Sequence, residues 1–312
     1  MKFTDNFRTA WNELWFFPVS AEHLGMYRCA FFALSFYLFQ SWEFARYAGA
    51  EPVLWYPVSF FVFLPQPASP ETLEVLAMVW KASLVTSALG FLTRLSTMIA
   101  FLLGAYLIGL THCYGLMRHS DAAFVVGLGI LAFARSGDGL SLDSLLGLWR
   151  RSGPAPLGTY SWPLRLTQFS WCMVFFLAGW AKVRYGQWSW FAGEVLHDYL
   201  IWVNMPYDFF RYSEAQRSIN AFLIARPALV AALSVGTVCI ELAVVLAFWR
   251  GNWAKILVPL AVCMQIGINL SMYIKFYQII PVYMVWVDWP RALAFLRRSA
   301  ERVCNRKSLR PG

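Results

Sequence analysis

The chain alternates between long apolar segments and short polar segments that hold glycine, proline and charged residues. The apolar segments have the length of helices, whereas the strands of an outer-membrane barrel would alternate apolar and polar positions over about ten residues. A helix that crosses a bilayer needs about 20 mostly apolar residues. The pattern therefore predicts an all-α, polytopic membrane bundle with about eight spans, at residues 22–41, 71–92, 95–110, 122–134, 163–181, 227–249, 253–273 and 277–289.

Three segments outside these spans also carry apolar residues. Residues 1–17 mix charges with tryptophans and predict an interfacial helix. Residues 51–70 place several prolines around an apolar run and suggest a re-entrant or interfacial segment, whose backbone must be buried in protein. Residues 185–226 are rich in Trp and Tyr and suggest a cap of interfacial helices. We expect a single bundle over residues 1–290, followed by a basic tail at residues 291–312.

Composition supports a membrane protein. Of the 312 residues, 59% are hydrophobic and only 14% are charged, which is not the composition of a soluble domain. Eight spans would use roughly 160 residues and leave no stretch for a separate soluble domain. The net charge of +9 comes from scattered basic residues and a basic tail, with no folded basic module, so we expect the lipid bilayer and no nucleic acid as partner. The six cysteines stand singly, mostly in apolar runs, and are interpreted as packing residues.

The basic residues also predict an orientation. Cytoplasmic loops carry the excess of Lys and Arg, and the richest cluster lies in the tail. An even number of spans then places both termini in the cytoplasm. We expect the inner membrane of a bacterium.

Ionisable residues gather where the third, fourth and fifth spans end on the predicted outer side. The turn THCYGLMRHSDAA holds His112, His119 and Asp121, and Lys182 follows the fifth span. We expect Lys182 and His119 to line one cavity, with aromatic walls from Trp180, Trp188 and Trp190. Two interpretations of Lys182 stay open, a snorkelling anchor or a desolvated amine that acts as a base. His119 is either a helix-capping or packing residue or a catalytic one.

Two further ionisable residues lie deeper in the spans. Lys81 and Glu241 are each surrounded by apolar residues, and buried charges in a bilayer normally have a partner in the bundle. We expect Glu241 to pair with Lys81 or with Arg28, and the sequence does not choose between them.

Several kinds of site lack their usual motifs. The chain has no H-E-x-x-H, no repeated Glu-x-x-His, no phosphate-binding glycine loop and no G-x-S-x-G. No metal, nucleotide or serine-hydrolase site is therefore expected. The two halves also show no repeat of the kind that secondary transporters carry.

A series of motifs in the same order resembles the horizontally transferred transmembrane domain family, which includes the membrane portion of vitamin K-dependent γ-glutamyl carboxylases. The matching strings are HLGMYRCAFF around Arg28, ALGFLTRLSTMIAFLL with Gly90 and Arg94, MRHSDAAFVVGLGILAF with His119, GDGLSLDSLLG with Ser141 and Asp143, FFLAGWAKVRYGQWSWFAG with Lys182, Trp190 and Gly193, Glu241 in the sixth span, and DWPRAL after the last.

The resemblance implies a chemistry for this site. The family lysine at the position of Lys182 acts as the base that deprotonates reduced vitamin K, and an epoxide and a carboxylated glutamate are the products. The histidine at the position of His119 helps to hold the quinone oxygens. The resemblance therefore implies a lyase-type enzyme with reduced vitamin K or a related quinol as cofactor.

The chain departs from the family pattern at several points. Arg118 replaces the asparagine before the fourth-span histidine, and the Asp121–Ala122 pair replaces an aromatic residue. Gln265 stands where the carboxylase has a histidine in the seventh span, and it can hydrogen-bond but not exchange a proton near neutrality. The large lumenal domain is also absent from this sequence, so a processive protein carboxylase is not expected. The leading hypothesis is an intramembrane enzyme that binds a quinol or other lipid-soluble substrate. The alternative is a non-enzymatic membrane factor for maturation or export of a secreted peptide, in either case with a secreted peptide or an oxidoreductase as a further partner.

Overall fold

A computed structural model describes residues 2–115, 118–148, 155–205, 213–249, 251–295 and 298. All regular secondary-structure elements of these residues are helices. Residues 206–212 of the predicted cap and most of the predicted basic tail lie outside the described residues. The chain divides into two compact units: unit 1 comprises residues 1–116, 127–166 and 281–312, and unit 2 comprises residues 117–126 and 167–280. The expectation of one bundle over residues 1–290 stays a prediction.

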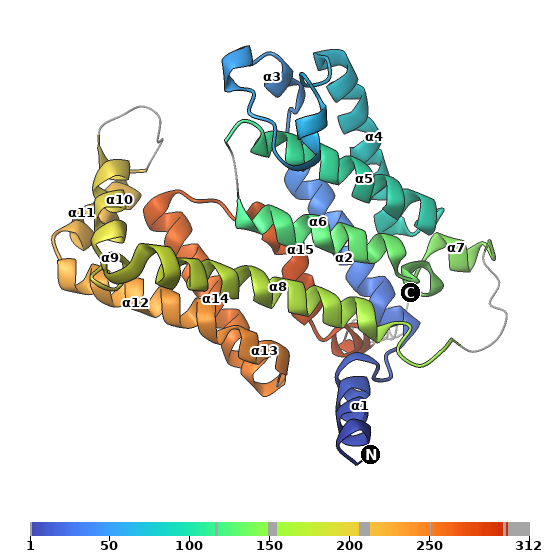
Figure 1. Cartoon of the computed structure of the whole chain (residues 1–312). Coiled ribbons are helices and arrows are strands. Elements are labelled where there is room, and N and C mark those ends of the chain that lie inside the picture. The colour runs from blue at the N-terminus through green and yellow to red at the C-terminus, as the bar shows by residue number, and fades with distance from the viewer. Residues whose placement is uncertain are drawn as a thin grey trace, which may run out of the picture. The chain divides into compact units, whose positions relative to one another are not determined.

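Most of unit 1 is formed by the N-terminal half of the chain. Helix α4 packs on both α2 and α5, and α3 packs on α4 (Figure 1). The elements up to the first unit boundary are α1 (Lys2–Trp15), α2 (Ala21–Phe39), α3 (Ala45–Ala48), η1 (Pro52–Leu54), η2 (Ser59–Phe63), α4 (Pro70–Leu89) and α5 (Thr93–His112). The elements η3 (Ser136–Asp138), α7 (Leu142–Leu145) and η6 (Met284–Trp286) also belong to it, and α6 (His119–Phe133), α8 (Ser161–Ala181) and α15 (Ile280–Tyr283) run across the unit boundary.

Unit 2 is built around α8, α12 and α14, with α10 and α11 packed against the latter two helices (Figure 1). Its elements besides α8 and the start of α6 are η4 (Lys182–Gly186), α9 (Gln187–Phe191), α10 (Glu194–Asn204), α11 (Glu214–Ile224), α12 (Pro227–Ala243), α13 (Val245–Trp249), α14 (Gly251–Met272) and η5 (Tyr277–Ile279).

Four helical segments of the described residues are long and apolar enough to cross a membrane, namely Pro70–Leu89, Thr93–His112, Pro227–Trp249 and Asn252–Met272. Each coincides with a predicted span, so the all-helical membrane class is confirmed. The predicted number of eight spans is not confirmed. The eighth predicted span, residues 277–289, consists of three short helices, and Pro281 lacks the amide hydrogen that a continuous helix would need there.

Local sequence explains where the two spans of unit 1 begin and end. Helix α4 begins at Pro70 after Ser69, whose hydroxyl accepts a hydrogen bond from the amide of Thr72, and it ends at Gly90 in the left-handed conformation that favours glycine. The N-terminus of helix α5 is capped by a residue that is distant in the sequence. Both carboxylate oxygens of Asp143 accept backbone amides at its N-terminus, from Leu92 and Thr93, each at 2.7 Å.

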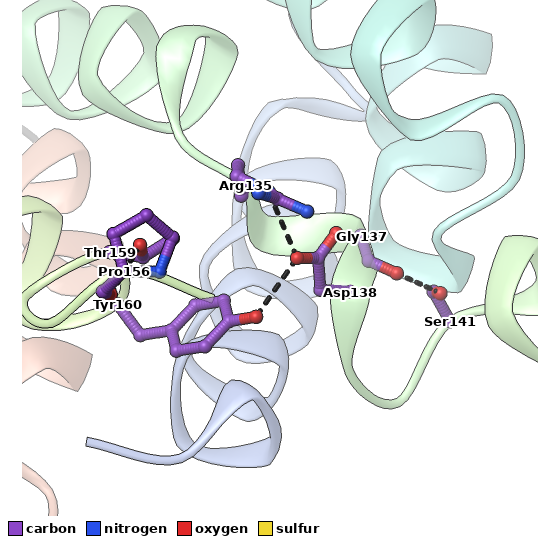
Figure 2. A network of polar contacts seen from close by, with 7 residues as sticks. All are labelled: Arg135, Gly137, Asp138, Ser141, Pro156, Thr159 and Tyr160. Atoms are coloured by element: carbon purple, nitrogen blue, oxygen red, sulfur yellow. Dashed lines mark hydrogen bonds and ion pairs between the residues drawn. The ribbon is translucent and has the colours of Figure 1, made fainter. Parts of the chain in front are cut away.

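The loop that carries Asp143 is tied to unit 1 by further polar contacts. The fully buried guanidinium of Arg28 donates to the carbonyls of Ser136 and Leu140, both at 2.7 Å. Figure 2 shows the next contacts, in which Asp138 accepts a hydrogen bond from the Tyr160 hydroxyl and pairs with Arg135. Arg28 therefore supports this loop.

Candidate functional site

A cavity of about 700 Å³ lies within unit 2. Its walls come from α8, η4, α9, α10, α11, α12 and α14, the first residues of α6, and the segment after α14. Most lining side chains are apolar, including Phe175, Leu233, Ile240, Leu260 and Met264. The polar and charged lining residues are Arg118, His119, Ser120, Lys182, Thr237, Glu241, Gln265, Ser271 and Lys275. A large apolar space with a few convergent polar groups is the usual form of a small-molecule site.

Lys182 directly follows α8, which ends at Ala181 as the predicted fifth span does. It is the first residue of the π-helical segment η4, which ends before Gln187, a residue with a φ of 45°. The short helix α9 follows. π-Helical segments are rare in proteins, and those that occur often lie at functional sites.

The contacts of α8 place its C-terminal end beside the interior of α12. Helices α8 and α12 pack closely, since a Cβ added to Gly179 would lie 2.9 Å from the Cβ of Glu241. In the span Pro227–Trp249, fourteen residues precede Glu241 and eight follow it. At 1.5 Å per residue, roughly 21 Å of helix precedes Glu241 and roughly 12 Å follows it. Glu241 therefore lies in the interior of this candidate span, and the position of Lys182 at the outer end of the fifth span stays a prediction.

Lys182 and Glu241 form an ion pair in the cavity wall. The amine nitrogen lies 2.6 Å from each carboxylate oxygen, and the side chains are 19% and 7% exposed. This finding corrects the expectation that Lys81 or Arg28 pairs with Glu241. Lys81 instead donates to the backbone carbonyls of Gln40 and Trp42 in unit 1, and Arg28 supports the loop described above.

Trp190 completes the surroundings of the amine. The Lys182 nitrogen lies 5.2 Å from the centroid of the indole ring, within the range of a cation–π interaction. The hydroxyl of Ser234 on α12 donates to the Trp190 carbonyl at 2.6 Å and so ties α9 to α12. Gly186 is required at its position, because an added Cβ would lie 1.7 Å from the Trp190 ring.

The structure brings only some of the other predicted residues to the cavity. His119 and Gln265 line it, together with Lys182, Trp190 and Glu241. Trp180 and Trp188 are 51% and 77% exposed and do not line it, so the expectation of three tryptophan walls is wrong for these two.

Two predicted polar residues lie elsewhere. Asp121 is buried in the first turn of α6 and does not line the cavity, and His112 belongs to unit 1 at the end of α5. Lys275 lines the cavity although the sequence analysis did not single it out. The available signal was its place among aromatic residues in SMYIKFYQ, directly after the seventh predicted span.

Among the described residues, no three His, Cys, Asp or Glu side chains form a group that could hold a metal ion. In comparisons with known proteins, no protein-family model, no curated protein and no solved structure matches the chain.

Proposed function

We propose that this protein is an intramembrane enzyme of a bacterial inner membrane, and that its unit 2 cavity binds a quinol or a related lipid-soluble substrate. The observation that carries the proposal is the Lys182–Glu241 ion pair in the wall of an apolar cavity. Ionisable side chains inside a membrane span are costly and most often mark a functional site. The resemblance to the carboxylase family adds the substrate class to this argument.

The residues of the cavity fit such a substrate. A volume of about 700 Å³ lies in the range of small-molecule pockets, roughly 300 to 1,000 Å³. The apolar walls of α12 and α14 suit an isoprenoid or alkyl tail. Lys182, His119 and Gln265 supply hydrogen-bonding groups for the ring oxygens.

The ion pair suits proton exchange with that substrate. A bound quinol would supply an acidic hydroxyl group and two electrons. Glu241 accepts the hydroxyl proton, and the Lys182 ammonium, released from its neutral partner, balances the negative charge left on the ligand. Since the amine contacts both carboxylate oxygens at 2.6 Å, the balancing cation lies directly beside the group that takes up the proton.

This scheme divides the role that the sequence analysis gave to Lys182 alone. Glu241 becomes the proton acceptor, and Lys182 becomes the cation that holds the anion in place. Apolar walls strengthen that electrostatic contact because they keep water away from it. His119 then orients the substrate oxygen at the other side of the ring.

The test supplies purified protein with reduced vitamin K in detergent micelles under oxygen and bicarbonate. Quinol consumption and epoxide formation are followed by chromatography. We expect Glu241→Gln and Lys182→Met to lower both rates at least about 100-fold, the usual contribution of a positioned acid–base group. Lys255→Met, which changes a lysine outside the cavity on α14, should leave the rates unchanged.

Wild-type protein that consumes quinol no faster than empty micelles would reject the enzymatic proposal. The alternative, a non-enzymatic membrane factor for a secreted peptide, would then lead.

A further inference from the structure

Another charged side chain of the cavity, Lys275, lies outside the Lys182–Glu241 ion pair. Lys275 follows α14, which ends at Met272, and it lines the same cavity as the ion pair. The segment that carries Lys275 is folded back on α14, because the amide group of Asn269 donates to the carbonyl of Ile274 at 3.3 Å. Tyr273 makes the turn with a φ of 56°, a conformation that L-residues rarely adopt.

Two tyrosine rings flank the Lys275 amine. Its nitrogen lies 4.6 Å from the ring centroid of Tyr273 and 5.7 Å from that of Tyr277. Burial alone would lower the pKa of Lys275, but hydrogen bonding and charge interactions with these tyrosines outweigh burial and raise it. The side chain is therefore a permanent cation at neutral pH.

Lys275 has no carboxylate partner among the described residues of the cavity. Glu241, the carboxylate among the described lining residues, is held by Lys182. No ion pair between described residues includes Lys275. A ligand with a negative group would supply this counter-charge and could accept a charge-assisted hydrogen bond from the amine.

Open space extends along the apolar wall of the cavity. A Cβ added at Gly236 on α12 or at Gly267 on α14 would meet no other atom within 4 Å. Both glycines line the cavity, next to Leu233, Ile240 and Met264. This wall suits a flexible hydrocarbon chain.

We infer that the cavity contains a subsite for an anionic amphiphile, whose carboxylate or phosphate group contacts Lys275 and whose alkyl chain lies along α12 and α14. This inference rests on the proposed ligand-binding role of the cavity but not on proton exchange at Lys182. A quinol lacks the acidic head group, so the subsite serves a second, acidic ligand. A lysine that only anchors the chain at the membrane surface would give no preference between charged and neutral ligands.

The experiment compares three probes with the same chain in a nonionic detergent: palmitate, hexadecyl phosphate and hexadecanol. Equilibrium binding to the purified full-length chain is measured for the wild type, Lys275→Met and Lys255→Met. We expect the wild type to bind at least one anionic probe about tenfold more tightly than hexadecanol, as about 1.4 kcal/mol would give. Lys275→Met should remove this preference, and Lys255→Met should keep it. The stronger anionic probe identifies the carboxylate or the phosphate as the head group.

Gly236→Phe separates failure of the subsite from failure of the cavity, because the ring would fill the open space at that position. If this variant abolishes binding of all probes but the wild type shows no preference for an anion, or Lys275→Met keeps the preference, the subsite is rejected and the cavity stands. If no probe binds, or Gly236→Phe changes nothing, the ligand-binding role of the cavity is rejected with it.

Discussion

Lys182 and Glu241 are the residues whose interaction tests the site most sharply. Each is more than four-fifths buried, and each has the other as its charged partner. Removing one member of a buried ion pair leaves an uncompensated charge, whereas replacing both with apolar residues of similar size is often neutral or stabilising.

We therefore predict that Lys182→Met and Glu241→Leu each lower the free energy of unfolding by about 3 to 5 kcal/mol. The double variant should recover most of this loss and still fail to consume quinol. Thermal unfolding in detergent, followed by size-exclusion fluorescence, measures the first effect. Additive losses in the double variant would show that the two side chains do not act as a pair.

Asp143 allows a second prediction at this scale. Its carboxylate accepts two backbone amides of the α5 N-terminus and the hydroxyl of Thr93, each at 2.7 Å. Asp143→Ala should lower the stability of the protein by about 1 to 3 kcal/mol, because buried amides lose their acceptors. Asp288→Ala is the matched control, since the half-exposed Asp288 also accepts a backbone amide, that of Arg291. A change in the control as large as that in Asp143→Ala would contradict this account.

The sequence identified most of the site residues but not their pairing. The order of motifs pointed to Lys182, His119, Trp190 and Glu241, and all four line one cavity. The partner of Glu241 lies 59 residues away on another helix. That contact depends on the position of α8 along the axis of α12. Close packing of Gly179 against Glu241 accompanies the observed position. Hydropathy does not contain that information.

At the scale of elements, the spans were predicted well wherever a helix ends at a clear signal. Ser69 with Pro70 and Gly90 mark both ends of α4, and the prediction for that span is close to the observed helix. Helix α8 likewise ends at Ala181, where the fifth span was predicted to end. The π-helical segment η4 that follows, Lys182–Gly186, was not predicted. Tertiary contacts of Trp190 with Lys182 and Ser234 accompany this segment.

A substitution on helix α12 tests whether the cavity holds the ligand. Gly236→Phe should abolish retention of lipid-soluble ligands while leaving thermal stability nearly unchanged, because the new side chain enters open space and not packed neighbours. Gly236→Ala, which adds one methyl group, should retain them. Mass spectrometry of organic extracts from the purified variants measures this. A Gly236→Phe protein that still retains the ligand would place the ligand outside the cavity.

For the molecule as a whole, the distribution of charge predicts an orientation in the membrane. The tail, residues 291–312, holds seven basic residues, Arg291, Arg297, Arg298, Arg302, Arg306, Lys307 and Arg310. Basic segments stay on the cytoplasmic side, where anionic lipids attract them. We predict that alkaline phosphatase fused after Gly312 is inactive and that a fluorescent protein at the same place is bright. An active phosphatase fusion would reverse the orientation.

The central claim is that the cavity of unit 2, with Lys182 and Glu241 in its wall, is a site for a lipid-soluble ligand. Photo-crosslinking with a diazirine-bearing alkyl naphthoquinol, followed by peptide mass spectrometry, tests it most directly. We predict that the label falls on lining residues of α12 and α14 between residues 232 and 241 and between residues 260 and 272, and that Gly236→Phe removes it. Labelling that is spread over the exposed faces of α4 and α5, or that is unchanged in Gly236→Phe, would contradict the claim.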